Sequence, residues 1–314
     1  MAEPLLAIEH LELRGPAGAV VSDVGFTVDA GEIVCVVGES GCGKSLSALA
    51  VLDLLPPGLA VTGGLVRFDG RDVLTGDARR RLRGRSVGMI FQEPGTALNP
   101  VYTIGFQIGE LLPGLSRAAR RARIAALLHK VGLDPGTADA HPHQLSGGMK
   151  QRAMIAMALA GEPRLLLCDE PTTALDPTVG AQILSQLRAL AAEGLGVVLI
   201  THDFHAVSRM GGKIVVMYAG QVVECGPVSA VLDAPAHPYT AALLATLPVK
   251  GRRPGSIPGQ VPPPGQRPPG CPFFNRCARV LPRCEQEPPP WFENGTGHTY
   301  RCHLSDKSDP GGST

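Results

Sequence analysis

Short apolar runs recur along the chain, separated by segments in which apolar residues repeat with a helical period. Strands are predicted at residues 6–13, 20–28, 33–37, 65–68, 87–91, 165–168, 197–200, 213–217 and 221–224. The runs at 165–168 and 197–200 are apolar at every position, as expected for strands buried on both faces of a parallel sheet. Ala219-Gly220 indicates a hairpin between the last two strands. The pattern predicts an α/β fold.

Helices are predicted between the strands, at residues 46–55, 150–160, 179–190 and 239–247. A longer helical stretch runs from Gln92 to His143. Its apolar residues fall on helix faces: Ile104, Ile108 and Leu111, then Ile124, Leu127, Leu128 and Val131 before Gly132. We therefore expect an α/β core at 1–92 and 155–235 with an antiparallel β part, a helical insertion at 93–154, and a Pro/Cys-rich extension at 236–314.

Bulk properties exclude some functions. The formal net charge of +1 gives no reason to expect a nucleic-acid partner, and the arginines between 79 and 85 fit a solvated helix face. No apolar run approaches the roughly 18 residues that a membrane span needs. The start, Met1-Ala2-Glu3-Pro4, lacks the basic segment and apolar core of a secretion signal, which predicts a cytoplasmic location.

A phosphate-binding loop follows the predicted strand at 33–37. Residues 38–45 (GESGCGKS) match the pattern G-x-x-x-x-G-K-[ST], and a predicted helix follows at Leu46. The glycines let backbone N–H groups turn inward, and the helix N-terminus adds partial positive charge. Lys44 is expected to reach the β- and γ-phosphates, and the Ser45 hydroxyl to bind Mg²⁺. The loop predicts binding of a nucleoside triphosphate.

A second anion site is predicted about 100 residues later in the chain. Residues 145–149 (LSGGM) place a serine and two glycines at the start of a helix. If the two loops of one chain do not bind the same nucleotide, the first loop of one subunit and the second loop of another can bind one nucleotide together in a dimer.

Further motifs follow in the order known from one family. Residues 145–152 (LSGGMKQR) resemble the signature L-S-G-G-Q-x-Q-R with Met149 in place of Gln, and residues 165–171 (LLLCDEP) resemble the second nucleotide motif. Residues 173–176 (TALD) resemble the D-loop, Gln92 the Q-loop and His202 the switch histidine. With the phosphate loop, these motifs resemble those of ATP-binding-cassette (ABC) ATPase subunits, which implies a P-loop NTPase, RecA-like core.

The resemblance implies a role for each residue. Asp169 would hold Mg²⁺ with Ser45 and Gln92, and Glu170 would act as the general base on the attacking water. His202 would contact the γ-phosphate, and Gln92 would sense it. The ATP of a second subunit would be bound by the signature residues Ser146, Gly147, Gly148 and Met149, with Asp176 in the D-loop. The residues expected at the chain's own ATP are Gly38, Ser40, Gly41, Cys42, Gly43, Lys44, Ser45, Leu46, Gln92, Asp169, Glu170 and His202.

Two other ATPase or GTPase classes fit less well. A P-loop GTPase would carry N-K-x-D, which is absent, and soluble ABC ATPases of translation or DNA repair generally carry two cassettes, coiled coils or internal zinc modules. One position departs from the family: the aromatic residue that usually stacks on adenine is replaced by Arg14 or Gly15. A guanidinium plane can also stack on a base.

The extension holds 12 prolines between residues 254 and 290, so it is expected to be disordered unless it is cross-linked. Four of its cysteines, Cys271, Cys277, Cys284 and Cys302, are spaced C-x5-C-x6-C-x17-C. A reducing cytoplasm opposes disulfides, and structural zinc sites prefer shorter spacings. The sequence therefore predicts a structural [4Fe–4S] cluster, with His298 and His303 as spare ligands. Loosening this tail is expected to spare nucleotide binding.

The extension also resembles one transporter group. Residues 237–240 (HPYT), 257–259 (IPG) and 271–277 (CPFFNRC) resemble the C-terminal extension of oligopeptide and dipeptide importer ATPases, and related importers for nickel or opines share it. The resemblance implies an ATP-hydrolysing subunit on the cytoplasmic face of the inner membrane. Implied partners are a second, different ATPase subunit, two membrane permease subunits and an extracytoplasmic solute-binding protein.

Overall fold

A computed structural model describes residues 3–74, 82–247, 255–295 and 297–305. Two compact units make up the chain: unit 1 (Met1–Leu6, Val28–Ile33 and Phe68–Thr201) and unit 2 (Ala7–Thr27, Val34–Arg67 and His202–Thr314). Most of the arginine run, Arg79 to Arg81, lies outside the described residues. The division into core, insertion and extension stays a prediction.

Unit 1 contains three parallel strands in the order β6 (Val87–Ile90), β7 (Leu165–Asp169) and β8 (Gly196–Ile200). Every residue of β7 and β8 is buried, as their continuous apolar sequences predicted. Gly88 allows a helix to lie directly on β6, because a Cβ there would come within 2.6 Å of the Ala158 carbonyl oxygen. The parallel strands place their carboxyl ends, where Asp169 lies, at the same edge of the sheet.

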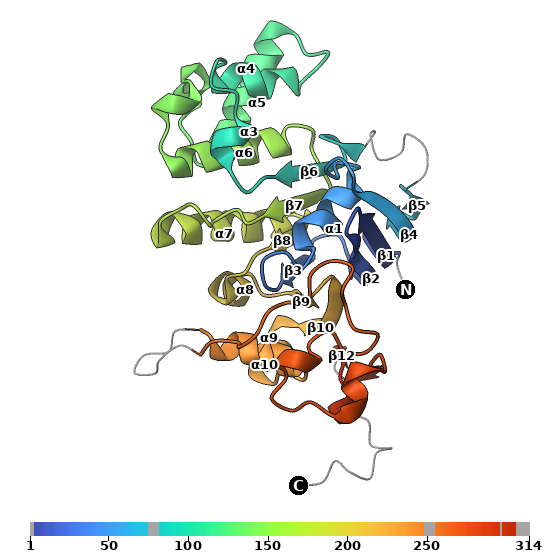
Figure 1. Cartoon of the computed structure of the whole chain (residues 1–314). Helices are drawn as coiled ribbons and strands as arrows, with labels where there is room; N and C mark the ends of the chain where they lie inside the picture. The colour runs from blue at the N-terminus through green and yellow to red at the C-terminus, as the bar shows by residue number, and fades with distance from the viewer. Residues whose placement is uncertain (1–2, 75–81, 248–254, 296, 306–314) are drawn as a thin grey trace. The chain divides into compact units, whose positions relative to one another are not determined.

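The helices of unit 1 follow the predicted periods. They are α3 (Pro94–Ala97), α4 (Ile104–Glu110), α5 (Arg117–Lys130), α6 (Gly147–Leu159) and α7 (Pro177–Ala192), with short 3-10 turns η1 (Pro135–Asp139) and η2 (Pro142–Gln144). Within unit 1, α4 and α5 lie beyond α6 and away from β7 and β8 (Figure 1). The predicted apolar faces are buried except at Leu111, which is 38% exposed.

Unit 2 contains two sets of strands. In one, β2 (Gly18–Val28) lies next to β1 (Leu6–Gly15), which lies next to β4 (Ala60–Phe68). In the other, β3 (Ile33–Val37) pairs in parallel with β9 (Lys213–Tyr218), which forms the predicted hairpin with β10 (Gln221–Pro227). Its helices are α1 (Lys44–Val51), α8 (Phe204–Met210), α9 (Val228–Asp233) and α10 (Pro238–Ala245).

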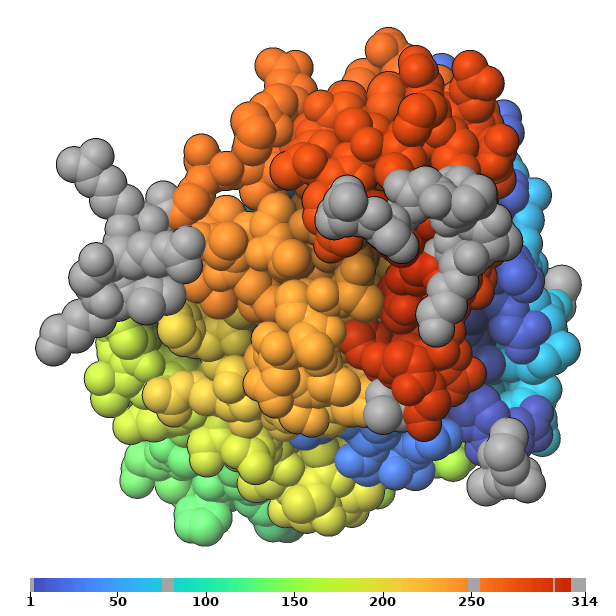
Figure 2. All heavy atoms as spheres, turned by 90° about the horizontal axis from the view of Figure 1, so that it is seen from below, coloured from blue at the N-terminus to red at the C-terminus, as the bar shows by residue number. Residues whose placement is uncertain are grey.

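The extension is ordered in a way that its composition did not predict. Strand β12 (Thr299–Arg301) pairs with β10, β11 (Trp291–Glu293) pairs with β12, and 3-10 turns form at η3 (Phe274–Arg276), η4 (Pro282–Glu285) and η5 (His303–Ser305). Figure 2 shows residues beyond 255 (orange to red) lying against the surface of α9 and α10. Pairing with the core hairpin supplies the backbone hydrogen bonds that a proline-rich segment lacks on its own.

A buried polar pair anchors this pairing. His298 Nε2 lies 2.6 Å from Glu224 Oε1, and the two side chains are 1% and 0% exposed. The same carboxylate accepts hydrogen bonds from the backbone N–H groups of Ala236 (2.7 Å) and His237 (3.0 Å). His298 is therefore held in a structural pair, and this is a different use from the spare ligand that the sequence suggested.

Candidate functional site

The phosphate loop in unit 2 joins β3 to α1 and depends on its glycines. Gly38, Gly41 and Gly43 all have positive φ angles (152°, 79° and 96°). A Cβ on Gly38 would lie 2.1 Å from the Met217 carbonyl oxygen, and one on Gly43 would lie 2.7 Å from Val21 Cγ2. A side chain therefore fits at neither position. Gly41, by contrast, faces open space.

Lys44 is the first residue of α1 and is 6% exposed. Its Nζ donates to the carbonyl oxygens of Gly38 (2.8 Å) and Glu39 (3.0 Å) and lies 3.8 Å from Cys42 Sγ. Burial raises the pKa of the Cys42 thiol, so Cys42 is a neutral part of the loop. The ammonium group is thus held inside the loop, where phosphate oxygens can take over from the carbonyl oxygens as its acceptors. Ser45 and Leu46 follow in the first turn and are half-buried.

Two side chains outside the motif hold the loop at Glu39. The Glu39 backbone N–H donates to the hydroxyl of Tyr239 (2.9 Å), and the Glu39 carboxylate accepts from Arg276. Both residues lie in segments that the sequence analysis linked only to the transporter group. The sequence motifs include both residues, but they did not indicate that these residues contact the phosphate loop.

Unit 1 holds the carboxylates predicted to act on the nucleotide. Asp169 ends β7 and is 8% exposed. Glu170 follows with a left-handed backbone (φ 46°), and its N–H donates to the Ile200 carbonyl oxygen at 2.9 Å. Its Oε2 accepts from Thr173 Oγ1 (2.8 Å) and lies 3.3 Å from Gln92 Nε2. The structure therefore brings Glu170 and Gln92 together, and it adds Thr173, to which the sequence analysis gave a place in the D-loop but no contact with Glu170.

The signature residues lie at the start of α6, also in unit 1. Ser146 is the N-cap, and its Oγ accepts from the Met149 N–H at 3.3 Å. A Cβ on Gly148 would lie 2.6 Å from Val179 Cγ1 of α7, so this glycine lets the two helices meet. Asp176 caps α7 by accepting from the N–H groups of Thr178 and Val179. The signature and the D-loop are therefore neighbours across the α6–α7 packing.

The remaining predicted residues lie in unit 2. His202 is exposed and directly follows the boundary of unit 1. Arg14, considered for the base, is exposed on β1. The predicted site residues thus form two groups. Unit 1 holds Gln92, Asp169, Glu170, Asp176 and the signature, and unit 2 holds the phosphate loop and His202.

The four extension cysteines line one cavity in unit 2, together with Phe273 and His303. Three of them are buried and Cys277 is half-buried. The Cys271 N–H donates to the Cys284 carbonyl oxygen (2.7 Å), and the Leu281 N–H donates to Cys284 Sγ (3.4 Å). Burial raises the pKa of Cys271 to about 12 and also raises the pKa values of Cys277 and Cys302. Among the described residues, no three His, Cys, Asp or Glu side chains are placed to hold a metal ion.

In the part of the chain that the structure describes, no helix is both long and apolar enough to cross a membrane.

Two family models match the sequence. The model described as ABC transporter matches residues 21–173. The model described as the C-terminal region of oligopeptide/dipeptide transporters matches residues 223–284.

Curated relatives match along nearly the whole length. The dipeptide transport ATP-binding protein DppD of Escherichia coli is 46% identical over 303 residues, which cover 92% of this chain and 93% of the relative. A putative peptide import ATP-binding protein of Brucella ovis is 42% identical, with 96% and 97% covered.

Solved structures agree on the fold. The cbiO1 protein of Clostridium perfringens, described as part of the ABC transporter complex cbiONQ, aligns with a TM-score of 0.67 at 26% identity, and the match covers 74% of this chain and 92% of cbiO1. The ATP-binding cassette MJ0796, dimeric and bound to ADP and Pi, has a TM-score of 0.63 at 28% identity, with 71% and 98% covered. This chain therefore belongs to the ABC transporter family of ATP-binding, ATP-hydrolysing subunits.

Proposed function

We propose that this chain is the ATPase subunit of a peptide importer. The observation that carries the proposal is the combination, in one chain, of an intact phosphate loop with a C-terminal region that matches oligopeptide/dipeptide transporters over residues 223–284. The names of the relatives, dipeptide transport and peptide import ATP-binding proteins, support the same cargo class.

The chemistry is assigned residue by residue. Lys44 binds the β- and γ-phosphates, whose oxygens replace the loop carbonyl oxygens as its acceptors, and Ser45, Asp169 and Gln92 are the residues that would hold Mg²⁺. The metal ion would neutralise phosphate charge. Glu170 takes a proton from the attacking water. Its carboxylate is oriented for this by the hydroxyl of Thr173 at 2.8 Å. His202 is the expected contact of the γ-phosphate.

A second ATPase subunit completes each site. Ser146 caps α6 and Gly148 lies in its first turn, and the N-terminus of a helix suits a phosphate. We infer that they bind the partner's ATP, so that the two subunits close around nucleotide. The proposed partner is a different ATPase subunit, and the assembly sits at the cytoplasmic face of the inner membrane with two permease subunits and an extracytoplasmic solute-binding protein.

An exposed apolar cluster in unit 1 is the proposed permease contact. Tyr102 and Phe106 stack with ring centroids 4.5 Å apart, and they are 45% and 48% exposed. Val101, the neighbour of Tyr102 in the chain, is 73% exposed. Exposed apolar groups gathered on one surface mark interaction sites, and aromatic residues are frequent interface anchors.

Phe106→Asp is expected to lower permease-stimulated ATP hydrolysis roughly tenfold, because a charge replaces an interface anchor. ATP affinity of the isolated subunit should stay unchanged. Co-purification with the permease and ATPase assays of the assembled transporter measure the two effects. Val280→Asp is the matched control, since Val280 is also 48% exposed but lies in the extension. Unchanged permease-stimulated ATP hydrolysis in the Phe106 variant would show that this surface is not the permease contact.

Reconstitution tests the function as a whole. The chain is assembled with its permease subunits and solute-binding protein in proteoliposomes, and the solute that stimulates ATP hydrolysis is identified by mass spectrometry of the loaded binding protein. Peptide is the expected cargo. Nickel or an opine in its place would reassign the transporter within the same group, and ATPase activity that no permease alters would favour a soluble ABC ATPase.

We also propose that the four extension cysteines hold a [4Fe–4S] cluster. Such a cluster takes one thiolate at each of four corners, and Cys271, Cys277, Cys284 and Cys302 line a common cavity. The N–H group that points to Cys284 Sγ is the type of donor that stabilises a bound thiolate. The bound group would cross-link the extension.

Cys277→Ser is expected to remove the iron and the brown colour from anaerobically purified protein, which should otherwise contain about four irons per chain. Iron analysis and visible absorbance measure the change. Cys225→Ser is the control, because Cys225 lies on β10 and outside the cysteine cavity. Stoichiometric zinc without iron in the parent protein would contradict the cluster.

A further inference from the structure

Arg276 lies in the cysteine-rich extension, and its side chain is 3% exposed. Its Nη1 and Nη2 form a two-pronged ion pair with Glu39 of the phosphate loop, at 2.6 Å to Oε2 and 3.0 Å to Oε1. Its other donors bind the carbonyl oxygens of Pro258 (2.9 Å) and Ile257 (3.2 Å) and the hydroxyl of Tyr218 (3.2 Å). Every N–H of the guanidinium therefore has an acceptor, so the group has one position.

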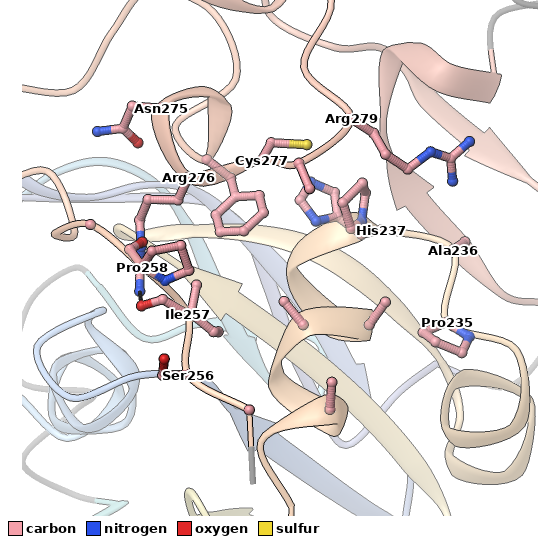
Figure 3. Close-up of a pocket in the computed structure, with 18 residues that line it drawn as sticks. Pro235, Ala236, His237, Ser256, Ile257, Pro258, Asn275, Arg276, Cys277 and Arg279 are labelled. Carbon is pink, nitrogen blue, oxygen red and sulfur yellow. Dashed lines mark hydrogen bonds between the residues drawn. The ribbon is translucent and has the colours of Figure 1, made fainter. Parts of the chain in front are cut away.

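Figure 3 shows how the side chain is placed. Arg276 extends toward Ile257 and Pro258 at the wall of a pocket of about 680 Å³, whereas Arg279 of the same segment points away. Gly259 makes this approach possible, because a Cβ there would lie 3.0 Å from Arg276 Cγ. The segment that holds Arg276 is thus shaped to receive it.

A cluster of aromatic side chains lies next to the contact between Arg276 and Glu39. Phe273 packs against Tyr218 and Tyr239 with centroid distances of 5.2 and 5.3 Å, and all three rings are nearly fully buried. The Tyr239 hydroxyl accepts the Glu39 backbone N–H. Glu39 is therefore held at its backbone by Tyr239 and at its carboxylate by Arg276.

Glu39 is also where the loop contacts its lysine, since the Glu39 carbonyl oxygen accepts from Lys44 Nζ at 3.0 Å. A shift of Glu39 would alter the curl of the loop and the position of the ammonium group. Bidentate contact by a buried guanidinium restricts such shifts more than a single hydrogen bond would. Binding of phosphates by a loop improves when the bound shape already exists in the free protein.

We propose that Arg276 is a positioning residue for the phosphate-binding loop, through which the ordered cysteine segment raises nucleotide affinity. The inference rests on the nucleotide role proposed for residues 38–45. Arg276 belongs to η3, which lies between Cys271 and Cys277 and is tied to both: the Phe274 N–H donates to the Cys271 carbonyl oxygen, and the Cys277 N–H to that of Phe274. Loss of order at the cysteines therefore displaces Arg276. This differs from the sequence expectation that a loosened tail spares nucleotide binding.

A double-mutant cycle on the full chain tests the proposal. ATP affinity is measured by fluorescence titration with a labelled ATP analogue for the parent protein, Arg276→Gln, Glu39→Gln and the double variant. Each single change should weaken binding roughly tenfold, and the double variant should bind no more weakly than either, because both remove the same contact. Arg276→Lys keeps the positive charge but loses the two-pronged hydrogen bonding of the guanidinium, so its ATP affinity should lie between those of the parent protein and Arg276→Gln. Cys277→Ser should also weaken binding, with no further loss when Arg276→Gln is added.

Two controls separate the possible failures. Arg279→Gln removes the same charge from an exposed position three residues along the same segment and should bind ATP normally. Lys44→Ala must lose binding; if it does not, residues 38–45 are not the nucleotide site and both proposals fall. ATP affinity equal to that of the parent protein in a folded Arg276→Gln variant would overturn the positioning role of Arg276. Losses of affinity that add up in the double variant would do the same. Neither result would affect the nucleotide role proposed for residues 38–45. If thermal melting shows that Arg276→Gln is unfolded, the test rests on Glu39→Gln and Arg276→Lys. ATP affinity equal to that of the parent protein in both variants would reject the proposal.

Discussion

Glu170→Gln is expected to slow ATP hydrolysis by roughly 100-fold or more while leaving ATP bound, because it removes the general base but keeps the size of the side chain. The structure gives the carboxylate a defined orientation. Thr173 Oγ1 donates to Oε2 at 2.8 Å, and the backbone N–H is tied to the Ile200 carbonyl oxygen at 2.9 Å. A glutamine accepts the same hydrogen bond, so the variant should fold normally.

Steady-state ATPase assays of the assembled transporter measure the loss, and nucleotide titration measures retained binding. Glu193→Gln is the control, since Glu193 forms an exposed pair with Lys130 on the same unit. The partner's own site can sustain some turnover, so single-turnover assays are needed to isolate this site. Turnover equal to that of the parent protein would reject Glu170 as the base.

The sequence predicted the buried strands and the motif positions well because both are local. Residues 165–168 of β7 and 197–200 of β8 are all apolar, so these continuous runs identified the two strands directly. The phosphate loop carries its own geometry, since Gly38 and Gly43 have no space for a side chain. Local patterns of this kind need no knowledge of the rest of the fold.

Other features depend on contacts between distant segments. Arg276 and Glu39 are 237 positions apart, and neither residue type signals the other. The pairing of β12 with β10 was missed because Thr299 to Arg301 is too short for a strand pattern, and because its order depends on the buried Glu224–His298 pair. Glu170 also takes a left-handed backbone that is uncommon for residues other than glycine. Such features follow from tertiary packing rather than from propensity.

Lys44→Ala and Ser146→Arg are expected to separate the two anion sites. Lys44→Ala should weaken ATP binding in this chain by roughly 10- to 100-fold, because a charged donor to the phosphates is lost. Ser146→Arg should leave that binding intact and abolish turnover at the partner's site, because the large side chain fills the start of α6 where the partner's γ-phosphate is proposed to lie. Nucleotide titration of the isolated subunit measures the first effect, and ATPase assays of the assembled transporter measure the second.

Ser116→Arg provides the matched control for the signature variant. Ser116 caps α5 as Ser146 caps α6, and each Oγ accepts a backbone N–H at 3.3 Å. The two substitutions therefore remove equivalent caps, each with a cost of about 1 kcal/mol in stability. Only the Ser146 change should stop turnover if the N-terminus of α6 binds a nucleotide. Equal loss of ATP affinity in the isolated subunit from Lys44→Ala and Ser146→Arg would contradict the cross-dimer arrangement, since it would place both loops at one nucleotide.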